Sequence, residues 1–321
     1  MDRQLSLEFA RITEQAALKS ARLVGLGDKE GADQAAVDVT HEQFALTPVS
    51  GTVVIGEGEI DEAPMLYIGE HVGQGGEEVD IAVDPVEGTN LVAKGKNGAI
   101  AVLAIAPKGC LLHAPDMYMQ KICVGPRAKG RIDIRASVTE NLKNVADAMG
   151  REVSDLTMVI LDRERHEKII REAREAGARV YLITDGDVVP SVDCGIQGSG
   201  IHMVMGSGGA PEGVLSAVGL KCLGGDMQAR LLPQTEQEIQ RLHTMGIDDP
   251  NKVLTLDDLV KGDDCIFAET AITDCAMLRG VRFFGGGART STLVLRYKTG
   301  TVRFIDTVHR FGEDKPGVRM F

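Results

Sequence analysis

Two hydrophobic patterns alternate along the chain, one with helical spacing and one made of short apolar runs typical of buried strands. Leu5–Leu23 carries the helical pattern, and Gly25 and Gly27 are expected to end that helix. Further helices are predicted at Ala32–Leu46, Ala63–Val72, Asn141–Met149, Arg163–Ala176, Ala210–Cys222, Thr235–Met245 and Leu256–Val260. Strands are predicted at Thr52–Ile55, Val79–Val83, Ile100–Ala106, Val124–Ile134, Thr157–Leu161, Val180–Thr184, Ile201–Met205, Cys265–Thr270, Gly280–Phe283, Thr290–Tyr297 and Thr301–Val308. The alternation predicts an α/β fold.

A length of 321 residues allows one large or two medium domains. Thr157–Leu161, Arg163–Ala176 and Val180–Thr184 predict a β-α-β unit, and a boundary is expected just before it, near Gly150–Asp155. We therefore expect an N-terminal subdomain over residues 1–150 and a C-terminal subdomain over residues 151–321.

The segment Asp84-Pro85-Val86-Glu87-Gly88-Thr89 follows one of the predicted strands. Two carboxylates three residues apart, across a turn stiffened by proline, are suited to Mg²⁺ or Mn²⁺, which prefer oxygen ligands. Gly88 leaves room for a phosphate, and Thr89 offers a hydroxyl that could orient an attacking water. A solvated surface turn is an equally good interpretation of this segment alone.

A second acidic segment makes the metal site the better interpretation. Glu57, Glu59 and Asp61 follow the strand Thr52–Ile55, just as Asp84 and Glu87 follow theirs. Carboxylates at two strand ends supply what two-metal hydrolysis of a phosphate ester requires.

A third candidate is the glycine-rich segment Gly206–Gly213, between a predicted strand and a predicted helix. A glycine loop before a helix N-terminus can bind phosphate, although here a purely structural role is about as well supported. Glu212 within the segment favours a metal ligand. Asp33, at the start of its predicted helix, is on spacing alone better explained as a complement to the helix dipole.

Composition limits the classes of function. A net charge of −12 argues against binding to nucleic acid or to an anionic membrane. The six cysteines form no CxxC pair and lie mostly in apolar stretches, which predicts buried thiols. No signal peptide or membrane span is visible, so a cytoplasmic location is expected. His41 and His166 are expected to be solvated, whereas His202 is expected to pack in a strand.

These motifs together resemble the class II fructose-1,6-bisphosphatases of bacteria, within the lithium-sensitive, metal-dependent phosphatase superfamily. The resemblance extends from the N-terminal helix to at least Gly225-Asp226-Met227-Gln228. It is carried by Gly27-Asp28-Lys29, Ala32-Asp33, Val54–Asp61, Ala63–Leu66, Asp80–Thr89, His113–Met119, Asp185-Gly186-Asp187 and Gly208–Gly213. It implies a layered α/β sandwich of the sugar-phosphatase type, with the active site between two subdomains.

The resemblance also implies roles for individual residues. Asp61 and Thr89 would take part in activating water. The cofactor would be Mn²⁺ or Mg²⁺, and its ligands would be Asp33, Glu57, Asp84, Glu87 and Glu212. The substrate would contact Glu87, Gly88, Thr89, Tyr118, Asp185, Gly186, Asp187 and Gly209. Where the family usually has Lys-Pro-Arg, this chain has Arg163-Glu164-Arg165, whose basic residues would bind the distal phosphate.

The expected reaction is hydrolysis of the 1-phosphate of fructose 1,6-bisphosphate, a small sugar bisphosphate, by a homo-oligomer. Three alternatives stay open. The substrate could be sedoheptulose 1,7-bisphosphate, alone or as a second substrate, or inositol monophosphate, as in more distant relatives. The chain could also be a non-catalytic sugar-phosphate sensor, although none of the expected carboxylates is missing.

Overall fold

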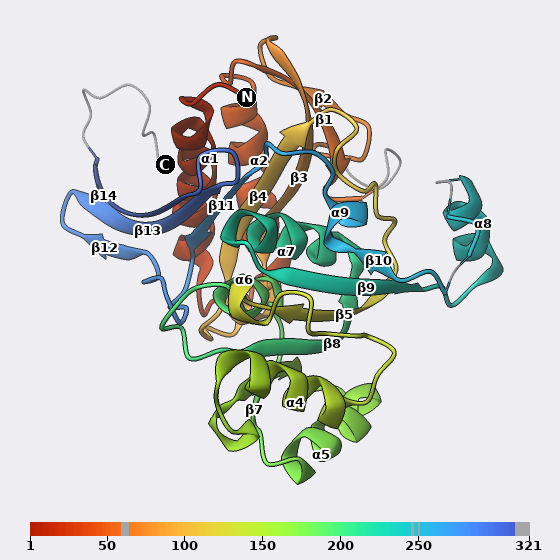
Figure 1. Ribbon diagram of the computed structural model, residues 1–321. Coiled ribbons are helices and arrows are strands. Elements are labelled where there is room, and N and C mark those ends of the chain that lie inside the picture. The colour runs from red at the N-terminus through yellow and green to blue at the C-terminus, as the bar shows by residue number, and fades with distance from the viewer. Residues whose placement is uncertain (59–63, 245–246, 250, 312–321) are drawn as a thin grey trace. The chain divides into compact units, whose positions relative to one another are not determined.

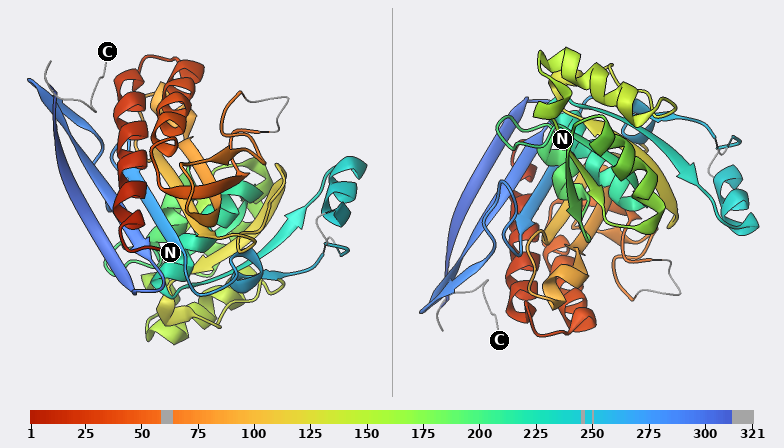
Figure 2. Two further views of the ribbon diagram at one scale, coloured as in Figure 1. Left: turned by 90° about the horizontal axis from the view of Figure 1, so that it is seen from above. Right: turned by 90° about the horizontal axis from the view of Figure 1, so that it is seen from below.

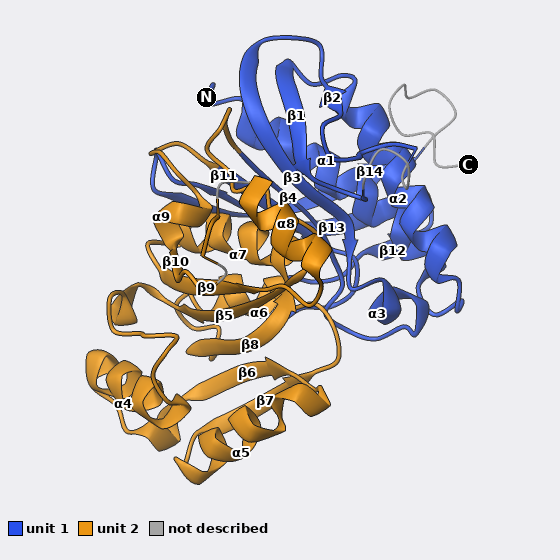
Figure 3. Ribbon diagram, turned by 90° about the vertical axis from the view of Figure 1, so that its right-hand side faces the viewer, with its two compact units in different colours: residues 1–105, 266–321 blue, residues 106–265 orange. Residues whose placement is uncertain are grey.

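The chain forms two compact units in the computed structural model, which describes residues 1–321 except 59–63, 245–246, 250 and 312–321 (Figure 1). The first unit comprises residues 1–105 and 266–321, and the second comprises residues 106–265 (Figure 3). Each unit contains a β-sheet and helices, so the predicted α/β class is confirmed.

The first unit is built on a mixed sheet with strand order β12-β13-β11-β4-β3-β1-β2, and β14 pairs with β13. Its strands are β1 (Val49–Ile55), β2 (His71–Val72), β3 (Glu77–Glu87), β4 (Ile100–Pro107), β11 (Ile266–Ala271), β12 (Arg282–Phe284), β13 (Gly287–Arg296) and β14 (Thr301–Arg310). Its helices are α1 (Leu5–Ser20), η1 (Ala21–Leu23), α2 (Lys29–Phe44) and α3 (Thr89–Ala93).

The amphipathic N-terminal helix buries its apolar face against this sheet. Helix α1 contacts β3, β11 and β13, and α2 packs beside it against β3 (Figure 2). Phe9, Phe44 and Ile81 are fully buried in the shared core. Burial of such side chains contributes roughly 1.5–3 kcal/mol each, so the core holds β3 in place beneath the acidic residues that end it.

The second unit has a sheet with strand order β10-β9-β5-β8-β6-β7. Its strands are β5 (Tyr118–Val124), β6 (Thr157–Leu161), β7 (Arg179–Ile183), β8 (Met203–Gly209), β9 (Asp226–Leu232) and β10 (Leu254–Thr255). Its helices are η2 (Pro126–Ala128), α4 (Val138–Met149), η3 (Val153–Asp155), η4 (Glu164–His166), α5 (Glu167–Glu175), α6 (Val188–Asp193), α7 (Ala210–Leu223), α8 (Glu236–Thr244) and α9 (Leu256–Leu259).

Side-chain alternation along β5 assigns its two faces to different helices. Ile122 and Val124 join the apolar core beneath α4 and α5. Lys121 lies on the opposite side of the pleat and contacts Asp187, which precedes α6. The predicted β-α-β unit is confirmed, because β6 and β7 pair in parallel on either side of α5 along the chain.

The observed units differ from the predicted division at residue 150, which falls inside the second unit. The reason is a long-range strand pairing. β11 pairs antiparallel with β4, from Ile266 opposite Ile105 to Ala271 opposite Ile100, and this pairing returns the C-terminal strands to the first sheet. Local sequence patterns carry no signal for such a return.

Two predicted elements are wrong. Residues 64–72 form turns and β2 where a helix was expected, and residues 59–63 lie outside the described part. The strand expected at Val124–Ile134 ends at Val124 and begins at Tyr118, and the glycine and proline that follow lead into η2. β12 and β13 form an antiparallel hairpin, with Phe284 opposite Gly287.

No helix in the described part of the chain combines the length and the apolar character needed to cross a membrane.

Asp193, the last residue of α6, offers a test of the packing in the second unit. Its side chain is buried, and neither carboxylate oxygen hydrogen-bonds a described residue. Burial raises the pKa of Asp193 from 3.8 to about 7. Between these two values the unfolded chain holds fewer protons than the folded one, so stability falls as pH rises from about 4 to about 7.

We therefore expect the stability of Asp193→Asn relative to the wild type to increase by ~3 kcal/mol between pH 5 and pH 8. Urea unfolding at a series of pH values measures the difference. Asp147→Asn, an exposed change on α4, is the matched control and should show no such trend. A constant difference between Asp193→Asn and wild type across pH would contradict the buried, ionising carboxyl.

Candidate active site

Asp84 and Glu87 lie at the end of β3, within the strand, where a turn was predicted. Asp84 Oδ1 accepts a hydrogen bond from the Val86 N–H at 3.0 Å. The pairing of β3 with β1 ends earlier, at Ile55 opposite Ala82, so the missing N–H of Pro85 breaks no hydrogen bond of that ladder. The strand thus delivers both carboxylates to one sheet end.

The chain turns sharply after Glu87. Gly88 has φ 89°, a left-handed conformation that favours glycine, and α3 begins directly at Thr89. The backbone path places Thr89, expected to orient water, two residues after the buried Glu87.

Asp33 and Glu57 form a second acidic pair in the same unit. Helix α2 begins at Lys29, so Asp33 is one turn further into the helix than expected. Burial, the charges of Asp84 and Asp33, and a hydrogen bond with Asp33 raise the pKa of Glu57 to about 8. Burial also raises the pKa of Asp33, against the opposing effects of Lys29 and of the hydrogen bond from Glu57. Burial, together with the neighbouring charges of Asp84 and Asp33, therefore favours the protonated form of Glu57.

In the second unit, β8 extends through the glycines that were expected to form a phosphate loop. A Cβ on Gly208 would lie 2.4 Å from Asp187 Oδ2, and a Cβ on Gly209 would lie 1.9 Å from Glu212 Oε2. In the arrangement seen, the carboxylates of Asp187 and Glu212 occupy the space that a side chain at either position would take. Helix α7 follows at once, with Glu212 in its first turn.

The negative charge of Glu212 is opposed by that of a buried lysine, Lys121, which was not predicted from the sequence as a site residue. Lys121 donates a hydrogen bond to Asp187 Oδ1 at 2.8 Å, and both side chains are nearly inaccessible. Burial raises the pKa of Glu212, the charge of Lys121 lowers it, and the charges of Asp187 and Asp116 raise it further; the net shift is upward.

The expected substrate residues of the second unit gather around Arg163 and Arg165. The Arg165 guanidinium lies 4.9 Å from the centre of the Tyr118 ring and donates to Ser207. Arg163 donates to Asp185 Oδ1 at 3.1 Å. Exposed Glu164 begins η4 between these two arginines, and Gly186, at φ 78°, separates Asp185 from Asp187.

His166 is buried, so the expectation of a solvated side chain is wrong. Its Nδ1 donates to the Leu161 carbonyl at 2.8 Å, and Nε2 accepts from the Ser207 N–H at 2.9 Å. Burial lowers its pKa, which favours the neutral ring these contacts require. His166 thereby holds Ser207, the partner of Arg165. Its pairing partner is 41 residues away, which explains why local sequence did not reveal the role.

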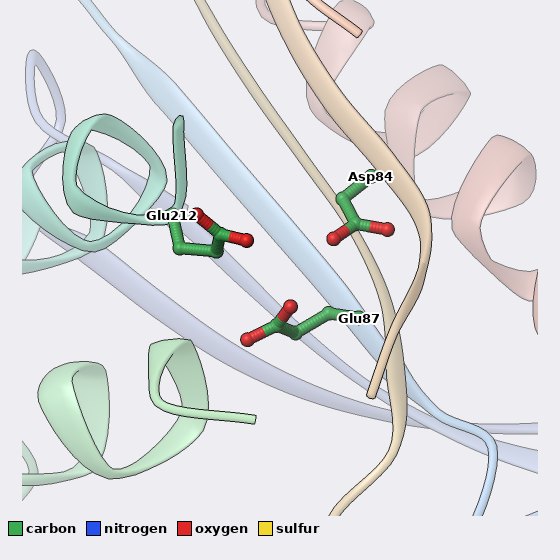
Figure 4. Close-up of side chains that lie close together, drawn as sticks. All are labelled: Asp84, Glu87 and Glu212. Carbon is green, nitrogen blue, oxygen red and sulfur yellow. The ribbon is translucent and has the colours of Figure 1, made fainter. Parts of the chain in front are cut away.

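Asp84, Glu87 and Glu212 each present a carboxylate oxygen, and these three oxygens lie within 4.8 Å of one another (Figure 4). Glu212 Oε2 is buried and hydrogen-bonds no described residue. Like charges at this spacing, one with an unsatisfied buried oxygen, fit a hard divalent cation, which would supply the missing partner. The donor set thus suits Mg²⁺ or Mn²⁺. Asp61 and Glu59 lie outside the described residues.

Comparison with known proteins agrees with this chemistry. The family model described as "Bacterial fructose-1,6-bisphosphatase, glpX-encoded" matches residues 3–309. A protein of Synechococcus sp. (strain JA-2-3B'a(2-13)) is 50% identical, with 100% of both chains covered. Proteins of Crocosphaera subtropica and Trichodesmium erythraeum are 48% and 47% identical, covering 96% and 98% of this chain and 97% and 99% of their own. All three are named D-fructose 1,6-bisphosphatase class 2/sedoheptulose 1,7-bisphosphatase.

The class that fold, site and relatives define is that of the phosphatases, enzymes that hydrolyse phosphate esters. Within this class, the chain belongs to the family of bacterial fructose-1,6-bisphosphatases encoded by glpX, because that family's model matches nearly its whole length.

Proposed function

We propose that the protein hydrolyses the 1-phosphate of fructose 1,6-bisphosphate, releasing fructose 6-phosphate and phosphate. The observation that carries this proposal is the group formed by Asp84, Glu87 and Glu212, in a chain of this family. Three carboxylates at metal-ligand spacing would repel a negatively charged phosphoryl group unless cations lay between the carboxylates and that group. A sensor would not need this arrangement.

We infer that Asp33, Glu57, Asp84, Glu87 and Glu212 hold Mg²⁺ or Mn²⁺ in one centre. When bound, such cations would neutralise the phosphoryl charge and activate the attacking water. The raised pKa of Glu57 supports this assignment: burial and the charges of Asp84 and Asp33 raise it, and a bound cation would offset those two charges.

The remaining roles in the reaction would belong to side chains and backbone near the carboxylates. The hydroxyl of Thr89, with Asp61, would orient the water. The backbone at Gly88 would leave room for the 1-phosphate beside Glu87, since no Cβ stands there.

The distal phosphate would bind in the second unit. The guanidinium groups of Arg163 and Arg165 supply fork-shaped donors that match phosphate oxygens, and Tyr118 holds Arg165 by stacking. Contacts to the sugar phosphate would come from Tyr118, Arg163, Glu164, Arg165, Asp185, Gly186, Asp187 and Gly209.

Arg165→Ala should raise KM for fructose 1,6-bisphosphate about tenfold and leave KM for fructose 1-phosphate nearly unchanged. The reason is that the monophosphate lacks the group that Arg165 would bind. Steady-state kinetics on both substrates measures the split. Arg171→Ala, an exposed change on α5, is the control. An equal rise in KM for both substrates would place Arg165 away from the distal phosphate.

A second activity, on sedoheptulose 1,7-bisphosphate, is favoured by one observation. The relatives of 47–50% identity cited above carry both activities in their names. We propose dual specificity for this chain. Both substrates are ketose bisphosphates, and exposed arginines such as Arg165 can adjust to a longer sugar.

We further propose a homo-oligomer in the cytoplasm, as the family resemblance implies. Buried thiols at Cys123, Cys194 and Cys265 are compatible with a reducing compartment. Size-exclusion chromatography with light scattering tests the assembly.

The proposed reaction is tested by phosphate release from fructose 1,6-bisphosphate with Mn²⁺ or Mg²⁺, with the sugar product identified by NMR. Sedoheptulose 1,7-bisphosphate and inositol 1-phosphate serve as comparison substrates. Turnover of both ketose bisphosphates, abolished by a chelator, would support dual specificity. Turnover of inositol 1-phosphate alone would overturn the proposal.

A further inference from the structure

A cavity of about 610 Å³ lies within the second unit, away from every residue assigned above. Its size is typical of a site for a small ligand. Three arginines, Arg127, Arg151 and Arg179, line it together with His202 and the loop 195–200. The lining includes no Asp or Glu. The cavity is therefore basic in a protein whose net charge is −12.

The arginines of this cavity have no carboxylate partner among the described residues. Arg127 donates to the Met149 carbonyl at 2.8 Å. Arg179 donates to the Asp155 carbonyl at 2.6 Å and to Thr157 Oγ1 at 3.2 Å. Neutral oxygens satisfy some of their N–H groups but none of their charge.

The contact between Arg151 and His202 brings two donors together. The Thr157 N–H donates to His202 Nδ1 at 2.9 Å, so Nδ1 is the acceptor and the ring proton belongs on Nε2. Arg151 Nη1 lies 2.9 Å from that same Nε2. A guanidinium has no acceptor, so the pair cannot form a hydrogen bond in this arrangement. An anion that accepts from both groups would resolve the conflict.

The loop supplies further donors. Gly198 and Gly200 have φ 91° and 77°, and the backbone N–H of neither hydrogen-bonds a described residue. The Ser199 N–H between them donates to the Ile196 carbonyl at 3.3 Å, so the loop offers two separate backbone N–H groups.

We propose that this cavity binds a small organic phosphate. The donors comprise three guanidinium groups, an imidazole N–H and backbone N–H groups. A phosphate offers three acceptor oxygens, whereas a carboxylate offers two, so phosphate matches this set better. Met149 and Ile196 add apolar surface to the lining, which suits an organic group attached to the phosphate.

Isothermal titration calorimetry with phenylphosphonate tests the site, because this probe joins a phosphate-like dianion to an apolar ring and cannot be hydrolysed to phosphate. The full-length protein is used in EDTA, so that no cation draws the probe to the carboxylates of the active site. The wild type should bind the probe, and Arg151→Gln/Arg179→Gln should weaken binding about tenfold or more. Arg135→Gln, at an exposed arginine paired with Asp133, should bind like the wild type.

Thermal unfolding checks that the double variant is folded. If it is not, Arg127→Gln decides the question, since its exposed side chain hydrogen-bonds a helix-end carbonyl and should also weaken binding. The proposal is overturned if the wild type does not bind at millimolar phenylphosphonate, or if folded arginine variants bind as the wild type does. Tighter binding of tricarballylate than of phenylphosphonate would overturn the preference for phosphate. Because no turnover is measured, failure here leaves the proposed reaction untouched.

Discussion

Replacing Asp84 with asparagine is expected to lower kcat/KM for fructose 1,6-bisphosphate by about 10³-fold or more while the fold remains intact. Asparagine keeps an oxygen that can accept from the Val86 N–H, so the local backbone retains its hydrogen bond. It removes the negative charge needed to bind a cation beside Glu87 and Glu212. Steady-state kinetics with Mn²⁺ measures the loss, and thermal unfolding in EDTA measures the fold.

Asp133→Asn is the matched control for this substitution. Asp133 is an exposed aspartate that also caps its own turn and pairs with Arg135, so its replacement should leave turnover unchanged. Wild-type turnover in Asp84→Asn would refute the site. Glu87→Gln should behave as Asp84→Asn does, since both carboxylates belong to the same group.

Lys121→Met is expected to destabilise the protein by ~3–5 kcal/mol, the largest stability effect we predict. Burial lowers the pKa of Lys121, but the charges of Asp187 and Glu212 outweigh it, so the lysine is charged. Its ammonium group lies 2.8 Å from Asp187 Oδ1. Methionine fills similar space but leaves two buried carboxylates without their counter-charge. Urea unfolding in EDTA measures the change.

Two further variants separate charge from packing at this site. Lys143→Met, at an exposed position on α4, should change stability by no more than ~0.5 kcal/mol. Lys121→Met/Asp187→Asn should recover part of the loss, because it removes one of the stranded charges. A Lys121→Met protein as stable as the wild type would show that the buried pair is not required. If the double variant recovered no stability, the stability lost in Lys121→Met would be assigned to packing.

The sequence predicted those parts of the fold that depend on neighbouring residues. The β-α-β segment, which the structure confirms, could be predicted because the hydrophobic period changes from strand to helix and back within Thr157–Thr184. The return of β11 to β4 could not be predicted, since it joins residues more than 150 positions apart and no local signal marks the pairing.

The acidic residues of the site could be identified from the sequence, but their neighbours could not. Asp84, Glu87 and Glu212 follow predicted strands and belong to recognisable motifs. Lys121 interrupts an apolar strand. From the local sequence alone, a lysine at such a position predicts an exposed residue or the end of a strand. The charge of Lys121 is offset by Asp187, 66 residues away, and by Glu212.

The glycines before α7 show what a glycine motif leaves open. For the segment of Gly208 and Gly209, a phosphate loop and a purely structural role were about equally well supported by the sequence. In the structure they belong to β8 and admit the carboxylates of Asp187 and Glu212. Sequence shows that a side chain must be absent, but it does not show which group occupies the space.

Mn²⁺ binding followed by electron paramagnetic resonance, alongside phosphate release, tests the central claim most directly. That claim is that Glu212 acts in one metal centre with Asp84 and Glu87. For the wild type, bound Mn²⁺ and turnover should rise over the same Mn²⁺ concentrations. Glu212→Gln should weaken Mn²⁺ binding about tenfold or more and lose turnover, whereas Glu236→Gln, an exposed change on α8, should do neither. Glu212→Gln protein that binds Mn²⁺ and hydrolyses fructose 1,6-bisphosphate as the wild type does would contradict the account.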